Sequence, residues 1–145
     1  MNTSTITFDQ FEKLKNDICQ ERIIEAKKIL GKDLVILGHH YQNEAVYRHA
    51  DFTGDSLKLA QYVQKLEAKY IVFLGVHFMA EVADILSRDD QITILPDLSA
   101  GCSMADMANL AKVERTYREI SKVVDFDEKI TPVTYINSAA DLKAF

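Results

Sequence analysis

The chain has 145 residues, of which 48% are hydrophobic and 27% are charged, and its formal net charge is -5. This composition excludes a disordered chain, and the acidic balance with no basic patch argues against nucleic acid or an anionic membrane surface as partner. No apolar stretch approaches the roughly 20 residues that cross a bilayer. Cys19 and Cys102 lie far apart and no apolar signal segment follows Met1, so we expect a cytoplasmic chain with reduced thiols.

The first predicted element is a helix that follows a short polar tail. Residues 7–10, Thr-Phe-Asp-Gln, have the form of a capping box that starts such a helix. Gly31 supplies a stop, and Cys19 inside the helix is interpreted as a packing residue. The apolar residues at helical spacing are Phe8, Phe11, Ile18, Ile23, Ala26 and Leu30.

Three apolar runs then alternate with helical patterns and predict a parallel sheet covered on both faces. The predicted strands are 34–37, 70–74 and 92–95, and the predicted helix after the second strand is 78–86. The helix after the first strand starts at residues 53–56, and its inner face is predicted to carry Leu57, Ala60, Val63 and Leu66. Right-handed crossovers bring all strand ends to one edge, so we expect His39, His77 and Cys102 to share it.

Beyond Cys102 the pattern predicts two helices, over 104–110 and 113–124, and then a fourth strand over 133–137. A further helix begins at Ser138, so the chain ends in the opening of another strand and helix pair. The predicted fold is therefore α/β, a three-layer α/β/α unit with a short parallel sheet. We expect three regions: an N-terminal helical segment over 1–31, a first α/β domain over 32–102 and an incomplete second one over 103–145.

The stretch from Pro96 to Asp106 runs from a strand through Gly101 into a predicted helix, with Cys102 at the turn. A helix N-terminus favours the thiolate, which is the form that attacks electrophiles or binds metals. The alternative is that Cys102 is a small buried hydrophobe, as most free cysteines in intracellular proteins are. The residues alone leave both interpretations open.

Other strand ends also carry polar side chains. In His39-His40-Tyr41 only one histidine can face the sheet edge, because neighbours in a strand point to opposite sides, and His40 is expected to be structural. Ser56 at a helix start could bind a carboxylate or phosphate, or could be a plain N-cap. His77 could act or cap its helix. Tyr135 and Asn137 alternate on the predicted fourth strand and so could grip one ligand.

Five motifs, in their order and at their intervals, closely resemble quinolinate synthase. They are 38–42 GHHYQ, 50–57 ADFTGDSL, 75–81 GVHFMAE, 95–103 LPDLSAGCS and 135–138 YINS. The resemblance covers nearly the whole chain after the first helix, but well under half of the family's length. It implies that the predicted unit is one of three similar α/β domains, followed by the beginning of the second.

The resemblance also implies an enzyme of NAD biosynthesis that condenses iminoaspartate with dihydroxyacetone phosphate to quinolinate. The family uses a 4Fe-4S cluster as a Lewis acid; Cys102 matches its first cysteine ligand, and two further cysteine ligands are expected outside this chain. Tyr41 and His39 match catalytic positions, and an aspartate-oxidising enzyme would supply the iminoaspartate. The positions that match iminoaspartate-binding residues are His39, Ser56, Tyr135 and Asn137.

Two other interpretations stay open. One is a non-catalytic remnant, and the other is a small thiol-based redox or binding module that uses Cys102. Cys19 lies outside the matching motifs and so cannot stand in for a missing ligand. The isolated chain is therefore expected to be inactive.

Overall fold

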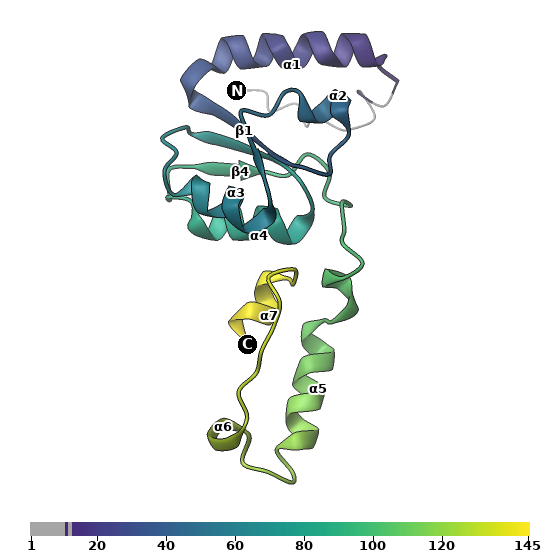
Figure 1. Cartoon of the computed structure of the whole chain (residues 1–145), viewed down its shortest axis with the longest axis vertical. Helices are drawn as coiled ribbons and strands as arrows, with labels where there is room; N and C mark the ends of the chain where they lie inside the picture. Colours follow the sequence, from purple (N-terminus) through teal and green to yellow (C-terminus); the bar gives the residue numbers. More distant parts are fainter. Residues whose placement is uncertain (1–10, 12) are drawn as a thin grey trace, which may run out of the picture.

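The computed structural model describes residue 11 and residues 13–145. Its first part is a four-stranded parallel sheet in the order β2-β1-β3-β4, with α1 on one face and α3 and α4 on the other (Figure 1). The strands are β1 Leu34–His39, β2 Phe52–Gly54, β3 Tyr70–Leu74 and β4 Ile92–Ile94. The predicted α/β class is therefore confirmed.

Seven α-helices and two short 3-10 turns lie within the described residues. The helices are α1 Asn16–Leu30, α2 Glu44–Tyr47, α3 Ser56–Val63, α4 His77–Leu86, α5 Leu110–Ile120, α6 Phe126–Lys129 and α7 Ala140–Ala144. Gly31 ends α1 as predicted: it has a positive φ of 51°, and its N–H donates to the Lys27 carbonyl. The predicted capping box over 7–10 lies outside the described residues. No described helix has both the length and the apolar character that a membrane span requires.

The hydrophobic core lies between the sheet and the α3–α4 layer. Leu37, Ile71 and Phe73 from the strands are fully buried there, together with Leu59 and Val63 from α3. Each such side chain contributes about 1.5–3 kcal/mol by leaving water. Prediction of Leu57 as a core residue is wrong, because it lies in the first turn of α3 and is 47% exposed. Leu59 takes its place, since it shares one helix face with Ala60 and Val63.

The strand β2 is a feature that the sequence analysis missed. It has only three residues and contains a glycine, so it carries no apolar run that would predict a strand. It pairs with the end of β1 in a register that sets Gly38 opposite Thr53 and His39 opposite Gly54. This pairing brings the start of α3 beside the last residue of β1.

The part of the chain after β4 departs most from the predicted pattern. The predicted strand over 133–137 is irregular backbone, which returns beside α5 toward α7 (Figure 1). Val133 is 90% exposed. A strand needs a neighbouring edge for its backbone hydrogen bonds, and the described residues offer none here. The predicted helix over 104–110 is a single 3-10 turn, Ala105–Met107, ahead of α5.

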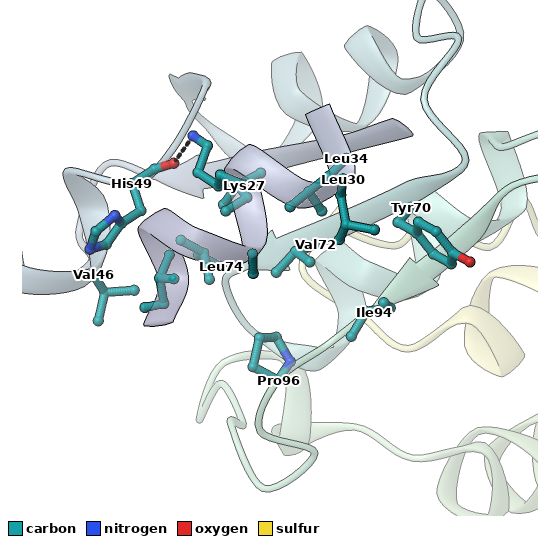
Figure 2. Close-up of a pocket in the computed structure, with 13 residues that line it drawn as sticks. Lys27, Leu30, Leu34, Val46, His49, Tyr70, Val72, Leu74, Ile94 and Pro96 are labelled. Carbon is teal, nitrogen blue, oxygen red and sulfur yellow. Dashed lines mark hydrogen bonds between the residues drawn. The ribbon is translucent and has the colours of Figure 1, made fainter. Parts of the chain in front are cut away.

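The layer formed by α1 is loosely packed on the sheet. A groove of about 580 Å³ lies between them, and Figure 2 shows apolar side chains converging on it. Its lining includes Ile23, Leu30, Ile36, Val72, Leu74 and Ile94. No residue of α1 is buried, so polar contacts anchor this helix. Lys27 donates to the His49 carbonyl at 2.7 Å and to Asp51 Oδ1 at 2.6 Å.

Candidate active site

The candidate site begins with His39, the last residue of β1, which is only 5% exposed. Its Nδ1 accepts the Tyr41 N–H at 3.5 Å, and its Nε2 lies 3.4 Å from Ser56 Oγ. Because a backbone amide can only donate, the neutral ring that fits this arrangement carries its proton on Nε2. That proton is directed to the Ser56 hydroxyl oxygen.

The surroundings of His39 favour its neutral form. Burial, above all, and then the charge of His40 lower the pKa of His39 below 6.5, while Asp55 only partly opposes them. The two histidines do differ in exposure, as alternation along a strand predicts. His40 is exposed, and its Nδ1 lies 3.2 Å from the Gly54 carbonyl oxygen, so it fastens β1 to β2.

Tyr41 packs its ring against His39, with 4.0 Å between the ring centroids. Its hydroxyl reaches Met79 Sδ at 3.9 Å, and about half of the side chain, 52%, is exposed. Burial, and then the electrostatic effect of Cys102, raise the pKa of Tyr41 above 10.0. The phenol therefore stays protonated at neutral pH and can donate a hydrogen bond or a proton.

Ser56 does not act as the N-cap of α3. Asp55 is the N-cap, and its Oδ1 accepts the Lys58 N–H at 2.8 Å. The plain N-cap interpretation of Ser56 is therefore wrong. Its hydroxyl is left free to meet His39 and a ligand.

Cys102 is partly buried and packs against the core cluster. Its carbonyl accepts the Asp106 N–H at 2.9 Å, and the residues that follow form the 3-10 turn. Prediction of an α-helix starting directly after the thiol is therefore wrong. The loop is fastened to α4, because the Ala100 carbonyl accepts the His77 N–H at 2.9 Å.

Of the two residues from the predicted fourth strand, the structure brings one to this loop. Asn137 Nδ2 lies 3.9 Å from the sulfur of Met104, two residues beyond Cys102. Tyr135 is 64% exposed. Ser138, which the sequence analysis did not single out, is buried and donates from Oγ to the Tyr135 carbonyl at 2.7 Å.

His77 does not cap α4. The N-cap is Val76, and His77 Nδ1 instead lies 3.4 Å from Glu81 Oε1 one turn along α4. Glu81 also accepts the Ala140 N–H on Oε2 at 2.8 Å, which links α4 to α7. Sequence reasoning missed Glu81, although an acid amid mostly apolar residues in the first half of this helix was a signal that could have found it.

The metal-binding side chains of this part of the chain can be compared with those that the expected 4Fe-4S cluster needs. Among the described residues, no group of three or more His, Cys, Asp or Glu side chains could hold a metal ion. The whole sequence has two cysteines, and Cys19 lies on α1. The residues of this chain alone thus do not fit a cluster held by three cysteines; Cys102 offers one thiolate to it.

Comparison with known proteins gives the same family as the motifs. The family model described as quinolinate synthetase A protein matches residues 21–145. The quinolinate synthase of Bacillus cereus (strain G9842) is 49% identical over 97% of this chain and 38% of its own length. Those of Bacillus licheniformis and Herpetosiphon aurantiacus are 52% and 51% identical, over 93% and 94% of this chain and 36% and 37% of their own lengths.

The chain thus spans somewhat more than a third of the length of these relatives. The family model nevertheless covers everything from the middle of α1 to Phe145, including β1 with His39, the Cys102 loop and the Tyr135–Asn137 segment. On this match, together with the motifs and the parallel sheet that presents them, the chain belongs to the quinolinate synthetase A protein family.

Proposed function

We propose that this chain supplies part of the active site of a quinolinate synthase, which condenses iminoaspartate with dihydroxyacetone phosphate to quinolinate in NAD biosynthesis. The relatives named above carry that enzyme's name. The observation that carries the proposal is the cluster of His39, Tyr41 and Ser56 at the carboxyl end of β1. Ligands of open parallel sheets bind at this edge.

His39 and Ser56 act together on a substrate carboxylate. Neutral His39 donates its Nε2 proton to Ser56 Oγ, which leaves the hydroxyl proton of Ser56 free for an anionic acceptor. A hydrogen bond to a charged group contributes about 1.5–3 kcal/mol. Iminoaspartate has two carboxylates, so it suits two donors, the Ser56 hydroxyl and the Asn137 amide. Tyr135 is assigned to the same ligand by its motif.

Tyr41 is the proposed proton donor. Its phenol stays protonated at neutral pH, because burial and the charge of Cys102 raise its pKa. A protonated phenol can give a hydrogen bond or a proton to a substrate oxygen that gains negative charge. Its contact with the His39 ring fixes the direction in which the phenol points.

Cys102 is the proposed ligand for one corner of a 4Fe-4S cluster, with the other two cysteines contributed from outside this chain. Such a cluster with one open iron supplies a Lewis acid for substrate oxygens. Within this chain, the role of the loop is to hold Cys102 in place against the hydrophobic core. An aspartate-oxidising enzyme is the proposed source of iminoaspartate.

A chimeric enzyme tests the proposal. This chain replaces the matching segment of the Bacillus licheniformis quinolinate synthase, and quinolinate formation and the absorption of the cluster are measured anaerobically. We expect an active chimera that loses cluster and activity with Cys102→Ser and keeps both with Cys19→Ser, since iron-sulfur clusters are held by cysteine thiolates. An inactive chimera, or the reverse pattern of the two variants, contradicts the proposal.

A further inference from the structure

We propose that Glu81 is a positioning residue, which holds the Tyr135–Asn137 segment in place against the first α/β unit. The inference rests on the proposed function, in which Tyr135 and Asn137 bind iminoaspartate. Glu81 itself lies outside that ligand site. It acts through the backbone at the start of α7.

The first step is the contact between α4 and α7. Glu81 Oε2 accepts the Ala140 N–H at 2.8 Å, across 59 residues of sequence. Helix α7 has no side-chain cap of its own, because its N-cap position is Ala139. Glu81 therefore supplies, from another element, the acceptor that a Ser or Asp cap would otherwise provide. His77 lies 3.4 Å from the other carboxylate oxygen and steadies it.

The second step is a contact that fastens the same segment from the other side. Lys143 Nζ donates to the Ser138 carbonyl and lies 5.6 Å from the centroid of the Phe78 ring on α4. Burial lowers the pKa of Lys143, and the charge of Glu81 opposes this. The Glu81 carboxylate and the Lys143 ammonium group thus hold residues 138–140 through two backbone hydrogen bonds.

The third step links these two hydrogen bonds to the proposed ligand residues Tyr135 and Asn137. Ser138 is buried, accepts from Thr134 Oγ1 at 3.3 Å and donates to the Tyr135 carbonyl at 2.7 Å. Its own N–H donates to the Ile136 carbonyl at 2.9 Å. The turn from 134 to 138 is therefore stiff, so a shift at Ala140 is passed on to Tyr135 and Asn137.

The fourth step is that no strand pairing holds this segment in the described residues. Residues 130–135 form irregular backbone without sheet partners, and in Figure 1 they return alongside α5 before α7 meets the α3–α4 layer. Helix α7 packs against α4 and α5. Loss of the Glu81 acceptor should therefore loosen the segment without unfolding the buried core between the sheet and α3.

The test uses three variants of the chimera described above: Glu81→Ala, Glu81→Gln and, as matched control, Asp84→Ala. Asp84 is an exposed acid one turn along α4. We expect Glu81→Ala to raise KM for iminoaspartate about ten-fold with a smaller change in kcat, because a binding segment is displaced. Glu81→Gln keeps an acceptor oxygen and should restore KM to within about three-fold of the parent. Asp84→Ala should leave both constants unchanged.

The same variants of the 145-residue chain give a readout that is independent of activity. Amide hydrogen exchange at Ala140, followed by NMR, should lose protection in Glu81→Ala and keep it in the Gln and Asp84→Ala variants. Unchanged Ala140 exchange in Glu81→Ala, or a KM no higher than that of the control, overturns the inference. Inactivity of the unsubstituted chimera would contradict the proposed function instead. In that case, hydrogen exchange at Ala140 still tests whether Glu81 holds the start of α7.

Discussion

His39 is a histidine that the fold keeps neutral. Its ring is buried between a backbone donor and a hydroxyl, so each nitrogen has a partner that suits one tautomer. Protonation would place a charge next to His40 in a site with little access to water. Burial keeps the ring neutral, and the Tyr41 amide, which can only donate to Nδ1, leaves the remaining proton on Nε2, directed to Ser56.

The lowered pKa of His39 predicts a dependence of stability on pH. The unfolded chain, with a histidine pKa near 6.5, binds more protons than the folded chain as the pH falls below that value. This contribution to stability is present above about pH 6.5 and is lost as the pH falls toward the lowered pKa. His49 adds to it, because burial and then Lys27 and Arg48 lower its pKa too.

Urea unfolding between pH 7.5 and 5.5 measures this dependence. The free energy of unfolding should fall less steeply with acidification in His39→Gln than in the parent chain. Leu57→Gln, at an exposed position that does not titrate, serves as control and should keep the parent slope. An equal slope in the parent and in His39→Gln contradicts the assignment.

Ser56 and Asp55 give a pair of predictions with opposite outcomes. Asp55 caps α3, so Asp55→Ala should lower the free energy of unfolding by about 1 kcal/mol. Ser56 makes no cap, so Ser56→Ala should leave thermal stability close to that of the parent and raise KM for iminoaspartate in the chimera. Thermal melts and steady-state kinetics check both. A large loss of stability with an unchanged KM in Ser56→Ala would restore the simple capping role.

At the scale of elements, the sequence predicted best those segments in which burial and periodicity agree. The strand over 70–74 and the helix behind it were predicted to within one residue, because both are apolar and tightly bounded. The segment 133–137 has the composition of a strand, but strand formation depends on a partner edge that no local pattern can show. The same lack of long-range information hid β2 and the contact between Glu81 and Ala140.

In the candidate site, too, features that follow from local patterns were predictable and features that depend on long-range contacts were not. His39, Tyr41 and Ser56 converge because β1 ends where α3 begins, and the register between β1 and β2 ensures it. The parallel topology was predictable from the alternating pattern, and so was the edge at which these residues lie. The role of Asp55 as the cap was not, because two neighbouring polar residues were equally able to start α3.

The pairing of β1 with its neighbours makes Gly38 a sensitive position. A Cβ at Gly38 would lie 2.8 Å from the Cβ of Ala50, which is shorter than real contacts allow. Gly38→Ala should therefore destabilise the chain by about 1–3 kcal/mol, as overpacking does. It should also displace His39 at the next position. The double variant Gly38→Ala/Ala50→Gly removes the clash and should recover most of the loss in urea unfolding. Equal stability of the single and double variants would show that this contact does not limit the position.

At the scale of the whole molecule, the two ends of the chain differ in how well they are packed. The first unit has a continuous core, whereas the part after β4 leaves large apolar side chains such as Met107, Val123 and Val133 mostly exposed. The proposed ligand residues lie on both parts, so their geometry depends on how the two parts are held together.

The last prediction concerns the 145-residue chain by itself: purified and treated anaerobically with iron and sulfide, it should form no quinolinate from iminoaspartate and dihydroxyacetone phosphate. One matched thiolate, Cys102, cannot replace three, and Cys19 lies on α1. Tyr41 and Tyr135 are also both more than half exposed, so a substrate bound between them stays hydrated. The electrostatic gain of a site closed to water is then lost.

The measurement is quinolinate formation over time, with the Bacillus licheniformis enzyme treated in parallel as the positive control. That control should gain the absorption of a cluster and make product, while the chain alone should do neither. Activity of the chimera, in which the chain is joined to the rest of the relative, would show that the residues of this chain can form a working active site. Quinolinate formed by the chain alone at a rate near that of the control would mean that His39, Tyr41, Ser56 and Cys102 suffice without further ligands.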